Sequence, residues 1–194
     1  MGFFKKNSRL ISQLFINQIG MTIFGAVLTV AVNMAVKGKS AFLLAVSLFS
    51  VIFYLALIYN VMWEAGARDI IRMESGRMEK DPLYALRVSL FASVPNFFLA
   101  LLMLIGFVLG YPLDLSFGRL LYGIMRIVAP LFEAMYAGLF GTILGTISDM
   151  VTEYLVSTLL YIFSSLPMIL VSIGAYELGK RNIYLFGKKA PKGK

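Results

Sequence analysis

The sequence lacks cysteine and histidine altogether. The absence of cysteine excludes disulfides and thiolate metal sites. The absence of histidine removes the commonest general base, the commonest metal ligand and the usual switch near neutral pH. A phosphate-binding loop is missing as well, because GTILGTIS and GARD lack the lysine and the spacing that a P-loop requires. We therefore expect a protein that is not an enzyme and that uses no cofactor and no metal ion.

Charged residues are also scarce, at 14% of the chain, whereas 59% of the residues are hydrophobic. Soluble globular chains contain roughly 45–50% apolar residues, and apolar stretches of about 20 residues mark membrane-spanning helices. The mean hydropathy of +0.83 agrees with the membrane class. The composition predicts an all-α integral membrane protein with a single membrane domain over residues 1–194.

Four apolar runs are long enough to cross a bilayer, at about 11–36, 41–62, 88–110 and 151–178. The second and third runs are separated by a polar interruption, which we expect to be a loop over 63–87. The second helix can continue past Trp63 into this loop, so the four-residue spacing predicts that Glu64, Arg68 and Arg72 share one helical face. Prolines at positions 95 and 167 are expected to kink the third and fourth spans. A basic tail follows the last run, at 179–194.

The stretch 113–149 is harder to assign. Arg119, Arg126 and Glu133 recur at seven-residue intervals, so they share one face of a continuous helix. The stretch either crosses the membrane with buried charges, or forms an amphipathic or re-entrant segment broken near Pro130.

The placement of the basic residues favours four spans. Fourteen of the 18 Lys and Arg residues and six of the 10 acidic residues then lie on the side that holds both termini and the polar interruption. The other side holds four basic and four acidic residues. Cytoplasmic loops carry the excess of Lys and Arg. We therefore expect a multi-pass protein of the cell membrane with both termini cytoplasmic and with 113–149 as a helical layer on the extracytoplasmic side.

The net charge of +8 predicts an anionic partner. The interruption at 63–87 holds five basic and five acidic residues, so the termini supply the excess charge. Cations interleaved with aromatic side chains can neutralise phosphates and stack on bases, and they can equally bind anionic lipids. The residues that we expect to bind RNA are Lys5, Lys6, Arg9, Arg68, Arg72, Arg77, Lys80, Arg87, Lys180, Arg181, Tyr184, Lys188 and Lys189.

Polar residues also fall within the apolar segments. Arg126 and Glu133 could form an intramembrane ion pair, and such charges often mark a transport pathway. The amides Asn17, Gln18, Asn33, Asn60 and Asn96 lie within or at the ends of spans. Hydrogen bonds between helices explain such amides more simply than a substrate path does.

Two pairs of glycines have the spacing that lets helix backbones approach closely, Gly106 with Gly110 and Gly141 with Gly145. Such contacts can form within one chain or between two copies of it. They favour a homodimer, or docking of the chain as an accessory subunit on another membrane protein.

The interruption WEAGARDIIRMESGRMEKDP and the tail KRNIYLFGKKAPKGK belong to a small, basic, cysteine-free chain with four expected spans. In this organisation the chain resembles the OLE-associated protein A family, bacterial inner-membrane partners of a large structured noncoding RNA. The resemblance implies a homodimer that holds RNA at the inner membrane face in a ribonucleoprotein complex and performs no chemistry. The predicted function is therefore RNA anchoring; the alternatives are a channel or transporter component that uses Arg126 and Glu133, or an accessory subunit.

Overall fold

The computed structural model describes every residue except 1, 37–39, 78, 80 and 185–194. All regular secondary structure in the described residues is helical, which confirms the all-α prediction. The helices are α1 (Gly2–Val36), α2 (Ser40–Glu74), α3 (Tyr84–Gly110), α4 (Ser116–Phe132), the short 3-10 helix η1 (Ala134–Tyr136), α5 (Ala137–Leu144), α6 (Met150–Phe163) and α7 (Leu166–Lys180).

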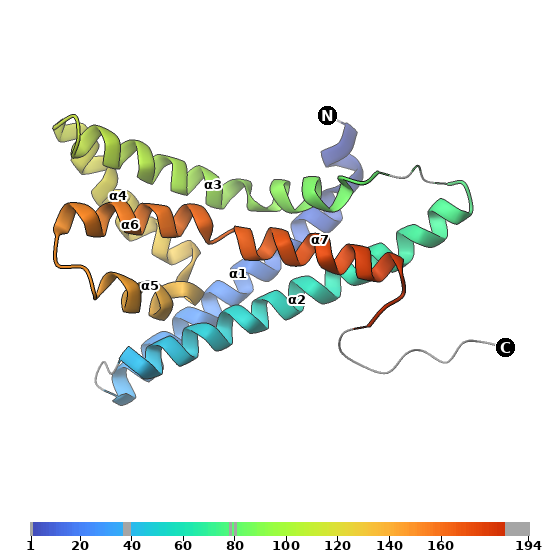
Figure 1. The fold of residues 1–194 in the computed structure, drawn as a ribbon, viewed down its shortest axis with the longest axis horizontal. Helices are drawn as coiled ribbons and strands as arrows, with labels where there is room; N and C mark the ends of the chain where they lie inside the picture. The colour runs from blue at the N-terminus through green and yellow to red at the C-terminus, as the bar shows by residue number, and fades with distance from the viewer. Residues whose placement is uncertain (1, 37–39, 78, 80, 185–194) are drawn as a thin grey trace.

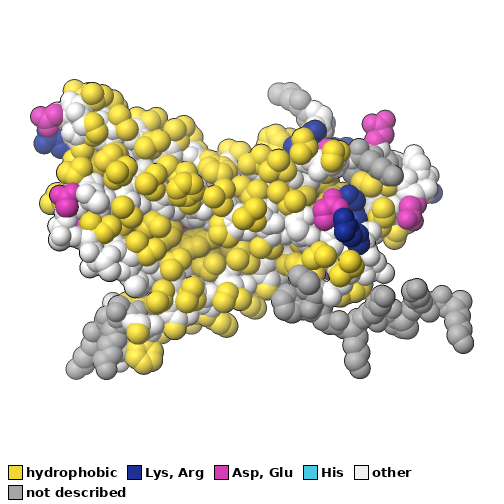
Figure 2. All heavy atoms as spheres, viewed as in Figure 1, with side chains coloured by type: hydrophobic (Ala, Val, Ile, Leu, Met, Phe, Trp, Pro, Cys, Tyr) yellow, Lys and Arg dark blue, Asp and Glu magenta, His cyan; other side chains and the backbone are white. Residues whose placement is uncertain are grey.

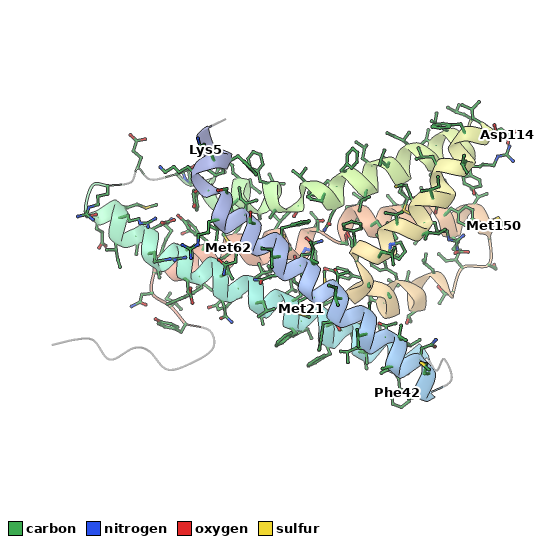
Figure 3. All side chains as sticks on the ribbon, turned by 180° about the vertical axis from the view of Figure 1, so that it is seen from behind. Lys5, Met21, Phe42, Met62, Asp114 and Met150 are labelled. Atoms are coloured by element: carbon green, nitrogen blue, oxygen red, sulfur yellow. The ribbon has the colours of Figure 1, made fainter. Side chains whose placement is uncertain are left out.

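Four helical segments are long and apolar enough to cross a membrane, namely α1, α2, α3 and the pair formed by α6 and α7. Their number agrees with the four predicted spans. The fifth apolar segment is bent by 87° between α4 and the η1–α5 stretch. Asp114, just before α4, and Met150, just after the α5–α6 connection, lie at the same end of the molecule (Figure 3). The segment 113–149 therefore enters the bundle and turns back, as expected of a re-entrant segment.

The N-terminal end of α1, the α2–α3 connection and the C-terminal end of α7 lie together at one end of the molecule (Figure 1). We call this the basic end. The α3–α4 and α5–α6 connections lie at the opposite end. Figure 2 shows apolar side chains over the middle of the visible face and charged side chains towards the two ends. Exposed aliphatic and aromatic side chains such as Val27, Phe98 and Leu170 belong to this apolar surface, which suits contact with lipid chains.

The polar interruption at 63–87 is helical at both of its ends, and the expected continuation of the second helix past Trp63 is present. The second helix continues to Glu74, because Glu, Ala, Arg and Met are good helix formers and nothing in 63–74 interrupts the helix. It ends where Gly76 adopts a φ of +70°, a conformation that glycine takes at little cost. The next helix already begins at Tyr84. With 35 residues, α2 is about 52 Å long and exceeds the ~30 Å hydrocarbon core.

Glycines bring α7 against α2 at close range. A Cβ atom added at Gly66 would overlap the carbonyl oxygen of Tyr176, and one added at Gly179 would overlap that of Trp63. The two backbones therefore touch through both glycines. This contact fixes the C-terminal half of the last span to the part of α2 that approaches the basic end.

The predicted glycine pair Gly106 and Gly110 also packs, but within the chain. A Cβ at Gly106 would lie 2.7 Å from the backbone nitrogen of Tyr122, and one at Gly110 would lie 2.6 Å from that of Arg119. Both positions are used by the contact between α3 and α4. A Cβ added at Gly141 would have no neighbour within 4 Å outside its own helix turn, and the predicted homodimer stays a prediction.

The last predicted span, 151–178, consists of two helices. The break falls at Ser164 and Ser165, and Pro167 follows within the first turn of α7, where a missing backbone N–H costs little. Pro95, by contrast, lies inside an uninterrupted α3.

Candidate functional site

A groove of about 360 Å³ opens at the basic end, between the start of α1, the end of α2 and the start of α3. It is lined by Lys6, Asn7, Arg9, Leu10, Gln13, Glu64, Ala65, Arg68, Asp69, Arg72 and Tyr84. We call it the basic groove. Four of its lining residues are among those that we expected to bind RNA, namely Lys6, Arg9, Arg68 and Arg72.

Helical periodicity explains how these cations meet. Glu64, Arg68 and Arg72 follow one another at four-residue spacing and share one face of α2, as the spacing predicts. On α1, Lys6 and Arg9 are three residues apart and share the face that looks at α2. The continuation of α2 beyond Trp63 is therefore what builds one wall of the groove.

The charges of the basic groove do not cancel. Its four cations outnumber its two acids, Glu64 and Asp69, which leaves a net charge of +2. Asp69 is buried; it accepts a hydrogen bond of 3.2 Å from the Tyr176 hydroxyl and pairs with Arg72 at 3.4 Å. Arg72 still exposes 63% of its side chain. The guanidinium groups of Arg68 and Arg72 therefore remain accessible to a partner.

A buried set of hydrogen bonds fixes the floor of the groove. The Tyr84 hydroxyl donates to Asn7 Oδ1 at 2.8 Å, and Asn7 Nδ2 donates to the Phe3 carbonyl at 2.9 Å. The Tyr84 ring also packs on the ring of Tyr176, with the centroids 5.2 Å apart. Three helices are thereby held in register beneath the cations, so the groove is preorganised.

The other predicted RNA-binding residues lie outside the groove. Lys5, Arg77 and Arg181 are exposed. Arg87 pairs with Asp81 at 3.3 Å, and Lys180 pairs with Glu177 at 2.7 Å. Lys80, Lys188 and Lys189 lie outside the described residues.

The aromatic residue predicted to stack on bases, Tyr184, already has a ring partner. Its ring lies 4.1 Å from that of Trp63, whose Nε1 donates to the Ile183 carbonyl at 2.7 Å. These contacts fold the segment after α7 back onto α2.

A second polar cluster lies in the middle of the bundle. Gln18 Nε2 donates to Asn96 Oδ1 at 2.7 Å, which confirms the expectation that these amides bond between helices. Asn96 Nδ2 in turn donates to Ser165 Oγ at 3.5 Å. One turn further along α1, the Thr22 hydroxyl donates to the Phe132 carbonyl at 2.8 Å.

The next residue, Glu133, completes the cluster. Its carboxylate is buried near Ser164, the neighbour of Ser165. The Ser164 hydroxyl itself donates to the Tyr161 carbonyl at 2.8 Å. These contacts involve neighbouring residues of α1, α3, the end of α4 and the break between α6 and α7, and we call the set the buried polar ring. Its members are Gln18, Thr22, Asn96, Glu133, Ser164 and Ser165.

The predicted pair of Arg126 with Glu133 is not formed. Arg126 pairs with Glu153 at 2.6 Å and lies 4.6 Å from the centre of the Tyr154 ring. The prediction assumed one continuous helix, but α4 ends at Phe132 and Glu133 has a φ of −130°. The break turns Glu133 into the bundle while Arg126 stays at the exposed surface. Ser164 and Ser165 were not predicted as site residues, and the only local signal is a serine pair ahead of Pro167.

The described residues contain no group of three or more acidic side chains placed to hold a metal ion. No protein-family model, curated protein or solved structure matches the chain. The resemblance to the OLE-associated protein A family therefore stays a prediction, and function has to be argued from the geometry of the basic groove and the buried polar ring.

Proposed function

We propose that this protein is a non-catalytic membrane anchor whose basic groove binds RNA phosphates at the cytoplasmic membrane face, as the membrane part of a ribonucleoprotein complex. The observation that carries the proposal is the convergence of Lys6, Arg9, Arg68 and Arg72 on one preorganised surface with a net positive charge. The proposal includes a cytoplasmic basic end and a homodimer.

The chemistry of the groove suits phosphate. Guanidinium groups offer planar pairs of N–H donors that match phosphate oxygens, and Arg68 and Arg72 present two such groups one helical turn apart. The basic residues around the groove, Lys5, Arg77 and Arg181, are exposed at the same end. Further phosphates of a long polyanion would meet these outer cations.

The position of the groove favours a polymer over a lipid head group. Glu64, Arg68 and Arg72 follow Trp63, an aromatic residue of the kind that lies at the membrane interface. The α2 wall of the groove therefore extends away from the apolar surface and into the space beyond it. A phospholipid anchored by its chains reaches this wall less readily than a soluble polyanion does.

The test is salt-dependent binding of a radiolabelled transfer RNA, used as a generic structured probe, to protein in nanodiscs of zwitterionic lipid. Replacing Arg68 and Arg72 together by Gln should lower the slope of log affinity against log salt by roughly 2, because each neutralised phosphate contributes about 0.9. The matched control is the pair Arg119→Gln and Arg126→Gln, which removes the same charge from the opposite end. Equal slopes for both double variants, or no binding of the transfer RNA, would refute RNA binding by the groove.

Orientation has its own test, because the chain has no cysteine. Single substitutions Lys5→Cys and Asp114→Cys place a thiol at the two ends of the molecule (Figure 3). In intact cells a membrane-impermeant maleimide should label Cys at position 114 and spare position 5. Labelling of position 5 instead would place the basic groove outside and contradict the proposal.

A further inference from the structure

Glu133 is a buried carboxylate with no cationic partner among the described residues. Only 4% of its surface is exposed, and none of the ion pairs in the described part of the chain includes it. Its Oε2 atom has no hydrogen-bond partner. A bare charge in an apolar interior costs several kcal/mol or more, so such groups are paired, coordinate a cation or become neutral.

A second unpartnered oxygen lies in the same ring. Gln18 is 2% exposed, and its Oε1 atom also lacks a hydrogen-bond partner. Its amide nitrogen is held by Asn96, so the orientation of the amide is fixed. Nearly all buried polar groups in proteins find a partner, and an exception calls for an explanation.

The contacts place these two residues on neighbouring segments. Gln18 and Thr22 are one turn apart on α1, and Thr22 bonds to the carbonyl of Phe132, which directly precedes Glu133. Asn96 joins Gln18 to Ser165, the neighbour of Ser164, and Ser164 lies near the carboxylate. The Tyr136 hydroxyl donates to the Ser164 carbonyl at 3.0 Å, and the Ser164 hydroxyl donates to the Tyr161 carbonyl at 2.8 Å. Hydroxyl and carbonyl oxygens therefore gather at the break between α6 and α7 beside Glu133.

Two helix ends meet at this place. The C-terminus of α4 lies at Phe132, and the C-terminus of α6 lies at Phe163, next to Ser164. The last carbonyls of a helix carry a partial negative charge that favours cations. Broken helices in membrane proteins use such ends to bind cations near the middle of the bilayer.

From this geometry we infer that the buried polar ring binds a monovalent metal cation of the size of sodium, with Gln18 Oε1 and Glu133 Oε2 as ligands. The unpartnered groups of the ring are both acceptors, so an anion is excluded, and a cation satisfies both oxygens and balances the carboxylate. One carboxylate balances one positive charge. Hard cations take carboxylate, amide and carbonyl oxygens as ligands. The inference does not depend on RNA binding.

A groove borders two residues of the ring, among apolar side chains. A groove of about 310 Å³ between α1 and the end of α4 reaches Gln18 and Thr22. The polar side chains therefore lie close to the surface of the bundle rather than behind several layers of side chains.

The experiment measures thermal unfolding of the full chain in nanodiscs, in NaCl, KCl and choline chloride at one ionic strength. A ligand that binds only the folded state raises the unfolding midpoint with its concentration. We expect the midpoint to rise with NaCl above its value in choline chloride, and this rise to disappear in Glu133→Gln. The control Glu153→Gln removes an acid that is partly exposed and paired with Arg126, and it should keep the rise.

Sodium binding can also be measured directly with the same samples. Wild-type protein should retain radioactive ²²Na⁺ in a scintillation proximity assay, and unlabelled NaCl should displace it while choline chloride does not. If Glu133→Gln does not fold, Gln18→Leu takes its place in both measurements. Equal midpoints in the three salts together with no ²²Na⁺ binding, or a midpoint that responds to pH alone, would overturn the sodium site and leave a proton as the occupant.

Discussion

The basic groove and the buried polar ring place polar side chains in opposite surroundings. In the groove, Arg68 and Arg72 are exposed, and water can accept hydrogen bonds from the guanidinium N–H groups that have no partner in the protein. In the ring, Gln18 and Glu133 are nearly inaccessible to water, so nothing compensates a polar atom that the protein leaves without a partner. Exposed ion pairs contribute about 0–1 kcal/mol, whereas an orphaned buried group costs about 1–3 kcal/mol. The groove should therefore tolerate substitutions that the ring does not.

The largest loss of stability is expected at the contact between α2 and α7, which supports both regions. The replacement Gly179→Leu forces a side chain into the Trp63 carbonyl and pushes α7 from α2. Overpacking typically costs about 1–3 kcal/mol, and a clash with backbone belongs at or above the upper limit. Thermal unfolding and size-exclusion chromatography in mild detergent would measure the loss.

The control for this variant is Gly174→Leu, on the same helix but with no atom within 4 Å of an added Cβ. It should change stability by no more than about 0.5 kcal/mol. Similar losses for both glycines would show that the contact between α2 and α7 is not what holds the two regions together.

The next effect isolates the ring. The replacement Asn96→Leu leaves Gln18 Nε2 without its acceptor and should destabilise the protein by about 1–3 kcal/mol. The same replacement at Asn33, which is exposed on α1, should be close to neutral. Unfolding midpoints in detergent compare the two variants directly. Affinity for RNA at the groove should stay unchanged in both, and a loss of RNA binding in Asn96→Leu would mean that the two regions are not separate.

A smaller effect distinguishes the ion pair that forms from the one that was predicted. A double-mutant cycle between Arg126→Gln and Glu153→Gln should give a coupling of about 0.2–1 kcal/mol, since both side chains are partly exposed. The cycle between Arg126→Gln and Glu133→Gln should give a coupling near zero. A clear coupling in the second cycle would restore the predicted intramembrane pair.

The smallest effect concerns an exposed carboxylate. Hydrogen bonds from the side chain and backbone of Thr152 lower the pKa of Asp149, which caps α6. A pKa that is lower in the folded state than in the unfolded state stabilises the folded state at pH values above the unfolded-state pKa. This stabilisation disappears as the pH falls through the pKa of the folded state. Asp149→Asn keeps the cap without the charge, so its midpoint should lie slightly below wild type near neutral pH and converge with it in acid. A constant difference across the titration would contradict this origin.

Much of the fold follows from local patterns. Long apolar runs predict the four spans, and four-residue spacing predicts the shared face of Glu64, Arg68 and Arg72. These patterns need no knowledge of the rest of the chain. The amides Gln18 and Asn96 could likewise be predicted to bond between helices, because an amide in an apolar helix has few other partners.

The site details depend on contacts between distant segments. Glu133 leaves the stripe of Arg119 and Arg126 because the helix breaks before it, and seven-residue spacing predicts a common face only within an unbroken helix. The burial of Asp69 beneath Tyr176 joins residues 107 positions apart. Neither arrangement has a signal in the local sequence, since each is decided by which helices pack together.

The length of α2 has an electrostatic consequence for the proposed binding of RNA. The helix continues for eleven residues from Glu64 to Glu74, or about 16 Å, beyond its interfacial tryptophan. At physiological ionic strength, repulsion between a polyanion and an anionic leaflet decays over about 8 Å. A strand bound to Arg68 and Arg72, which lie about 8 and 14 Å along the helix beyond that tryptophan, would stand about one to two screening lengths from the lipid charges, so the helix would act as a spacer between two negative surfaces.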